Sequence, residues 1–108
     1  MSKPSYTWWP YVRNMVRAYP KRERCDTLRR VPQMEQDAVK TAMEKTMQRP
    51  DGEHRVKLIE LVYMRRGRTT MQQAAMKIPT SYGTARRWNC DFFLDVAEAF
   101  GIYDPPEE

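Results

Sequence analysis

Cysteine and histidine are scarce in this sequence, and their positions exclude most of the sites built on them. The chain of 108 residues has two cysteines, Cys25 and Cys90, and a single histidine, His54. Their separations do not match the spacing of zinc ligands, so we predict no metal site. Cys25 and Cys90 lie far apart, and we expect both to be free thiols.

Long apolar runs are absent as well. The run Leu61–Met64 ends at charged residues, and no run approaches the roughly 20 residues that a membrane span needs. The first residues show no apolar stretch followed by a small-residue cleavage site. We therefore expect no secretory signal, no membrane association and a cytoplasmic location.

Residues arranged for catalysis are also missing. His54 stands among charged residues without a neighbouring nucleophile or carboxylate relay, and Glu53 and Glu60 fall on a polar helix face. No glycine-rich loop for phosphates occurs. We expect a protein that is not an enzyme and that uses no cofactor.

The composition predicts an all-α fold, a small helical bundle. Glycine occurs only four times, apolar residues do not alternate as they do in strands, and helix-forming residues are abundant. We predict helices over about 8–19, 33–48, 52–66, 72–77 and 82–100. Thr7, Asp51, Thr70 and Ser81 stand at cap positions, and Pro20 and Gly67 stand where helices end. The charged segment 21–31 fits either a helix extension or a linker.

Apolar residues at helical spacing predict which faces are buried. The second helix presents Val39, Ala42, Met43 and Met47, and the third presents Val56, Leu58, Ile59, Val62 and Tyr63. In the last helix the apolar stripe is formed by Ala85, Trp88, Phe92, Val96 and Ala99. We divide the chain into an aromatic and basic helical region, 1–50, and a second region, 51–108.

The second region has the layout of a helix-turn-helix. Thr70 and Gln73 have the spacing of a capping box, and Pro79 stops the short helix that follows. Ser81 then caps a longer helix, and the small Ala75 permits the two helices to cross closely. A short helix, a turn of three or four residues and a longer helix are typical of a helix-turn-helix.

One face of this unit is strongly basic. Between Leu61 and Cys90 the chain contains six arginines and lysines and no acidic residue. Arginine suits bidentate contacts with guanine and pairing with phosphate, and the start of a helix can hold a phosphate. The predicted DNA-binding residues are Arg68, Lys77, Ser81, Tyr82, Gly83, Thr84, Arg86, Arg87 and Cys90.

The segments 74–78, 84–88 and 91–92 resemble the RinA-like and ArpU-like family of phage and prophage transcriptional regulators. The resemblance extends upstream to 53–63 and to 8–13. It implies a helix-turn-helix similar to the promoter-reading C-terminal domain (region 4) of bacterial sigma factors. It also implies binding to double-stranded DNA near promoters, activation of phage late genes and RNA polymerase as a neighbouring partner.

We therefore expect a sequence-specific DNA-binding regulator that pairs as a homodimer. Two alternatives stay open. The first is a phage DNA-packaging protein of the small terminase type or a recombination accessory protein. The second is a helical adaptor that holds a protein partner through its aromatic N-terminus, Tyr6, Trp8, Trp9, Tyr11 and Tyr19, near Arg13 and Arg17. The same aromatic residues would otherwise complete the core.

Overall fold

The computed structural model describes residues 7–65 and 69–102, and these residues form helices without any strand. Five α-helices and one short π-helical segment, η1, follow one another along the chain. Their bounds are α1 Trp9–Glu23, α2 Arg30–Met47, α3 Gly52–Ile59, η1 Glu60–Met64, α4 Met71–Lys77 and α5 Tyr82–Phe100. The predicted all-α class is confirmed.

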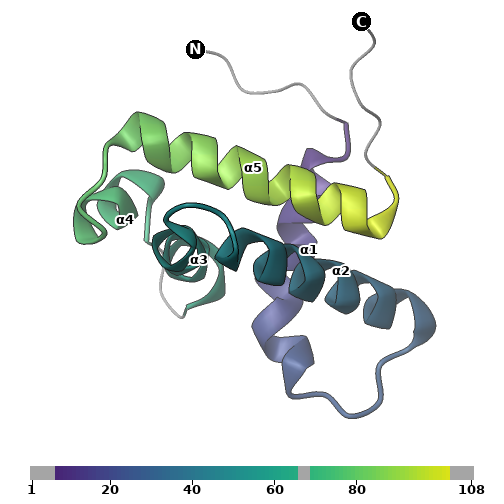
Figure 1. The fold of residues 1–108 in the computed structure, drawn as a ribbon. Coiled ribbons are helices and arrows are strands. Elements are labelled where there is room, and N and C mark those ends of the chain that lie inside the picture. The colour runs from purple at the N-terminus through teal and green to yellow at the C-terminus, as the bar shows by residue number, and fades with distance from the viewer. Residues whose placement is uncertain (1–6, 66–68, 103–108) are drawn as a thin grey trace, which may run out of the picture.

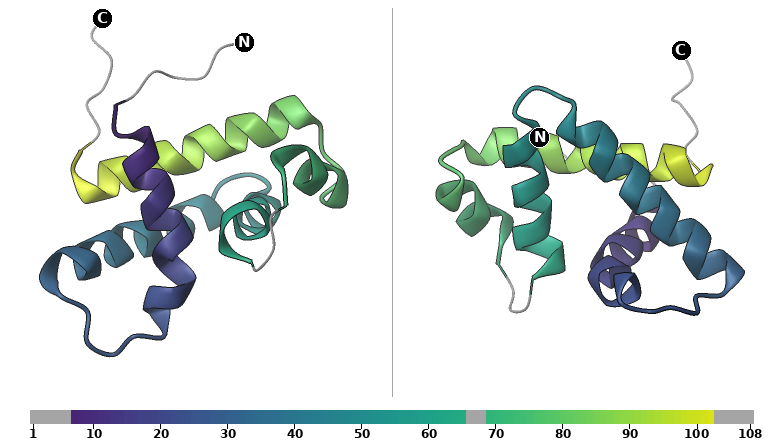
Figure 2. Two further views of the ribbon diagram at one scale, coloured as in Figure 1. Left: turned by 180° about the vertical axis from the view of Figure 1, so that it is seen from behind. Right: turned by 60° about the horizontal axis from the view of Figure 1, so that its bottom comes forward.

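Helix α5 is the longest helix, and the others are arranged around it. Figures 1 and 2 show α2 and α5 side by side and running in opposite directions, with α1 crossing both at a steep angle. Helices α3 and α4 gather at the N-terminal end of α5. No helix within the described residues is long and apolar enough to cross a membrane.

A first core lies where α1, α2 and α5 meet. Each of these helices contributes apolar side chains that are almost completely buried, and α3 adds Ile59 at its end. The members are Val12, Met15, Val16, Ala38, Val39, Ala42, Ile59, Phe92, Phe93, Val96 and Ala97. Burying a larger side chain such as Phe92 stabilises the fold by about 1.5–3 kcal/mol, so this core holds α1, α2 and α5 together.

A second, smaller core joins α3, η1, α4 and the N-terminal half of α5. Its members are Leu58, Leu61, Ala74, Ala75, Ile78, Ala85 and Trp88. Four of the five predicted positions on α5 are buried as expected, and α5 contributes to both cores. The predicted boundary between 1–50 and 51–108 stays a prediction.

Helix α1 departs from its predicted bounds at both ends. The cap position is held by Trp8 without a side-chain hydrogen bond, so the predicted cap at Thr7 is wrong. Pro20 lies inside the helix, which continues to Glu23. Tertiary contacts hold this last turn, because Arg22 binds Glu35 and Gln36 Nε2 donates to the Tyr19 carbonyl at 2.9 Å. Segment 21–31 therefore begins as a helix extension, and 24–29 forms a loop.

The predicted third helix is divided into α3 and η1. The wider π-helical turn is closed by the N–H of Arg65, which donates to the Glu60 carbonyl at 3.0 Å. It leaves Leu61 in the second core while Tyr63 packs against the first. Asp51 stands at the cap position but makes no side-chain cap bond, because its backbone is left-handed with φ of 60°. Gly67 lies outside the described residues.

Two predicted core residues are exposed, Met47 and Ala99. The buried stripe of α2 ends on Thr46, and Met47 points to the neighbouring side of the helix. In the last turns of α5 the buried residues are Val96 and Ala97 and not Ala99. The buried face changes along the helix because the two cores contact α5 from different sides.

The glycines at 52 and 83 should respond oppositely to alanine. A Cβ at residue 52 would lie 2.2 Å from the Met47 carbonyl oxygen, whereas a Cβ at residue 83 meets no atom within 4 Å. We expect Gly52→Ala to lower the free energy of unfolding by about 1–3 kcal/mol. We expect Gly83→Ala to raise it by about 0.5–1 kcal/mol, since alanine favours the helix. Urea denaturation measures both, and equal effects would contradict the packing at Gly52.

Candidate functional site

Both helices of the α4–α5 unit begin with side-chain caps, as predicted. The Gln73 N–H donates to Thr70 Oγ1, and the Thr70 N–H donates to Gln73 Oε1, each at 3.1 Å. The Thr84 N–H donates to Ser81 Oγ at 3.0 Å. These bonds satisfy backbone donors that a helix start leaves unpaired, so the starting residues of α4 and α5 are determined locally.

Small side chains bring α4 close to α5. Ala74 and Ala75 are buried in the second core together with Ala85 of α5. The turn after α4 closes when the Thr80 N–H donates to the Ala75 carbonyl at 3.0 Å. Pro79 lacks an N–H and makes no such bond. The predicted role of Ala75 at a close crossing is consistent with its burial.

The predicted site residues on α5 differ in their exposure. Ser81, Tyr82, Gly83 and Arg87 are exposed, whereas Thr84, Arg86 and Cys90 are half-buried. The Arg86 guanidinium lies over the Tyr82 ring, 5.6 Å from its centre, in a cation–π contact that orients both side chains.

Two of the predicted DNA-binding residues, Arg68 and Lys77, lie outside α5 and its cap. Lys77 is exposed at the last position of α4, immediately before the turn. Arg68 lies outside the described residues.

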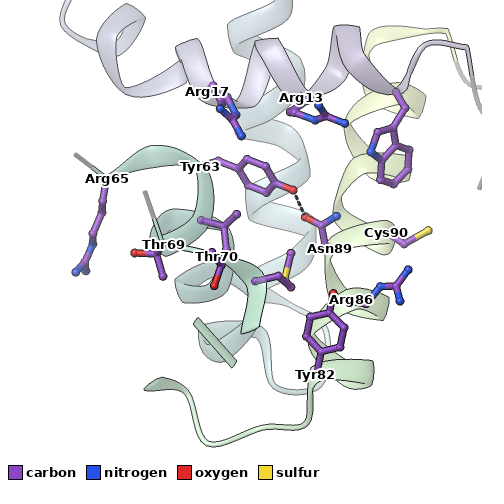
Figure 3. Close-up of a pocket in the computed structure, with 13 residues that line it drawn as sticks. Arg13, Arg17, Tyr63, Arg65, Thr69, Thr70, Tyr82, Arg86, Asn89 and Cys90 are labelled. Carbon is purple, nitrogen blue, oxygen red and sulfur yellow. Dashed lines mark hydrogen bonds between the residues drawn. The ribbon is translucent and has the colours of Figure 1, made fainter. Parts of the chain in front are cut away.

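A cleft of about 640 Å³ opens beside the N-terminal half of α5, and we call it the arginine cleft. Four arginines line it, Arg13 and Arg17 from α1, Arg65 after η1 and Arg86 from α5. Figure 3 shows Arg17 reaching from α1 towards Tyr63 and Arg13 extending from α1 towards α5, with Arg65 on the opposite side of Tyr63 from α5 and Arg86 beside Tyr82. The cleft thus brings the predicted Tyr82, Arg86 and Cys90 together with residues of α1.

Within residues 7–65 and 69–102, no carboxylate lines the arginine cleft. Among the described residues, none of its four arginines forms an ion pair, although Arg17 lies over the Tyr63 ring at 5.7 Å. Elsewhere two arginines that join helices are paired: Arg49 Nη2 binds Asp95 at 2.9 Å, and Arg55 Nη1 binds Asp91 at 3.2 Å. The cleft therefore gathers four arginines that no described carboxylate neutralises.

A hydrogen-bonded pair forms part of the lining. The Tyr63 hydroxyl donates to Asn89 Oδ1 at 2.8 Å, so the amide NH₂ of Asn89 remains as a donor. Burial raises the pKa of Tyr63, and the charge of Arg13, the bond to Asn89 and the charge of Arg17 act in the opposite direction. Tyr63 therefore stays a neutral hydroxyl.

Sequence reasoning did not include Arg13, Arg17, Tyr63 and Asn89 among the DNA-binding residues. Arg13 and Arg17 are four residues apart and share a helix face, which was the available signal. That this face turns towards α5 follows only from the packing of α1 in the first core.

The aromatic N-terminus packs on the core. Trp8 and Trp9 are half-buried against the first core, and the Trp9 and Phe93 rings are 4.6 Å apart. Tyr11 donates a hydrogen bond to Glu35. The contacts of Trp8 and Trp9 support the hypothesis that these residues complete the core, whereas Tyr11 is exposed. Tyr6 lies outside the described residues.

The cysteines are free thiols, as expected, with Cys25 exposed and Cys90 half-buried. Burial, and secondarily the charge of Asp91, raises the pKa of Cys90. No three histidine, cysteine, aspartate or glutamate residues gather as a metal site within 7–65 and 69–102.

Comparison of the chain with known protein families, with characterised proteins and with solved structures gives no match.

The raised pKa of Cys90 predicts a slow thiol. Because its pKa is raised, a smaller fraction of Cys90 is thiolate at pH 8 than of a thiol with the ordinary pKa, and the thiolate is the form that reacts. We expect the Cys25→Ser variant, which retains Cys90, to react with iodoacetamide more slowly than the Cys90→Ser variant, which retains the exposed Cys25. Equal alkylation rates would contradict the burial of Cys90.

Proposed function

We propose that the α4–α5 unit binds double-stranded DNA as a helix-turn-helix, with α5 entering the major groove. The observation that carries this proposal is the exposed, acid-free start of α5, which presents Arg87 and Gly83 beside Arg86. The capped starts of both helices and the close crossing at Ala75 are what such a unit requires.

The chemistry of this face suits DNA. Arg87 is exposed, and Arg86 is oriented by Tyr82, so the two can divide base contacts and phosphate contacts between them. Gly83 has open space around its Cα, which allows the backbone of α5 to approach a partner closely. Lys77 adds a further charge at the end of α4, where backbone phosphates flank the groove.

We further propose that the protein is a transcriptional regulator of phage or prophage origin with a sigma-like helix-turn-helix, acting near RNA polymerase. This part of the proposal rests on the resemblance of segments 74–78, 84–88 and 91–92 to the RinA-like and ArpU-like family. A homodimer would place two copies of α5 about 34–36 Å apart, one turn of the DNA helix.

The test is selection from a pool of random duplex DNA at two salt concentrations. We expect the wild-type protein to enrich a defined motif and the Arg86→Ala, Arg87→Ala variant to lose it. If Arg86 reads a base, Arg86→Ala alone should weaken the free energy of DNA binding by about 1–3 kcal/mol and relax the preference at one base position.

The matched control is Arg29→Ala, Arg30→Ala, which removes the same charge from exposed positions at the start of α2. It should keep the motif. Motif-free binding by the wild type, with the same salt dependence in the wild type and in the Arg86→Ala, Arg87→Ala variant, would refute the proposal. Tolerance of the Arg86 and Arg87 changes together with loss of function on changing Trp8 or Trp9 would favour the protein adaptor. Ring-like higher oligomers in light scattering would favour the small terminase reading.

Gly83 offers a second test. Because the space around it is open in the free protein, Gly83→Gln should not lower the free energy of unfolding. It should weaken duplex binding several-fold, since the added side chain would stand between the backbone of α5 and the DNA. Anisotropy titration with the selected duplex measures this, and unchanged affinity would show that Gly83 does not face DNA.

A further inference from the structure

The arginine cleft has two walls from distant parts of the chain. One wall is the N-terminal half of α5, with Arg86 and Asn89, and the other is α1, with Arg13 and Arg17. Figure 3 shows Arg17 directed from α1 towards Tyr63 and Arg13 directed from α1 towards α5. The helix-turn-helix layout explains the first wall and leaves the second without a role.

The lining of the cleft consists mainly of hydrogen-bond donors. Four guanidiniums donate and cannot accept. The Asn89 amide has its oxygen occupied by the Tyr63 hydroxyl, so it offers its NH₂ group. Thr69 and Thr70 also line the cleft, and their hydroxyls can donate. A ligand that matches this surface is rich in acceptors and negatively charged.

Within the described part of the chain, no carboxylate supplies that negative charge to the cleft. The arginines that serve the fold are neutralised by Glu35, Asp91 and Asp95, whereas no described carboxylate pairs with the arginines of the cleft. Like charges held near one another repel, and an anion in the cleft would remove that repulsion.

We infer that α1 is a second DNA-contacting element, whose Arg13 and Arg17 bind backbone phosphates of the duplex that α5 reads. The inference rests on the proposed function. Its occupant is argued from continuity, because Tyr82 and Arg86 belong both to the cleft and to the start of α5. A phosphate strand beside α5 would therefore run onto the arginines of α1. These contacts position the protein without reading sequence.

The experiment measures affinity for the selected duplex as a function of salt. The variant Arg13→Gln, Arg17→Gln is compared with Arg29→Gln, Arg30→Gln, which lowers the net charge equally at the start of α2. Loss of two phosphate contacts should make the slope of log K against log salt shallower by about 1.8, since each contact contributes about 0.9. Affinity should fall by the same factor for the selected duplex and a scrambled one.

Arg13→Lys, Arg17→Lys should keep most of the slope, because lysine retains the charge that a phosphate contact needs. Thermal unfolding of each variant establishes that the fold is intact. If the slope of the Gln variant equals that of the Arg29 and Arg30 control, the inference is overturned and the effect is one of net charge.

A titration with inorganic pyrophosphate separates a small anion from a DNA backbone. Shifts of the Arg13 and Arg17 Nε–H resonances with pyrophosphate, combined with an unchanged duplex slope, would overturn the inference in favour of a small-anion site. If no motif is enriched but the Arg13→Gln, Arg17→Gln variant still shows a shallower salt slope than the control, base reading by α5 is refuted. The phosphate contacts of α1 are then still supported. If a motif is enriched and the α1 pair behaves like the control, only the inference about α1 fails.

Discussion

Helix α5 belongs to two cores at once, and the positions of the other elements depend on this. Ala85 and Trp88 hold its first half against α3, η1 and α4, while Phe92 and Phe93 hold its second half against α1 and α2. A 19-residue helix is a rigid rod of about 28 Å. Packing in the first core therefore determines where the start of α5, with Arg86, lies relative to α1.

Charge is distributed in the fold according to the same geometry. Acidic side chains on α2 and on the second half of α5 pair with arginines that secure the helices to one another, as Asp95 does with Arg49. No acidic residue occurs between Leu61 and Cys90, and no described carboxylate pairs with the arginines near the start of α5. The arginine cleft arises because α1 adds Arg13 and Arg17 to a segment that already lacks acids.

Much of the local structure followed from the sequence. The caps at Thr70 and Ser81 depend on residues three positions apart, and both form as predicted. Errors arose where distant contacts override a local signal. Pro20 does not end α1, since the contacts of Arg22 and Tyr19 with α2 hold the following turn in place. The division of the third helix at Glu60 has no local signal and serves two different cores.

The sequence by itself determined the helical class, the α4–turn–α5 layout and the basic, acid-free character of the segment before Cys90. Caps, apolar spacing and composition act over a few residues, and each can be read along the chain. Only the tertiary structure decided that α1 faces α5 across the arginine cleft and that Tyr63 and Asn89 meet. Those pairs are separated by tens of residues, so their approach depends on how the helices pack in the first core.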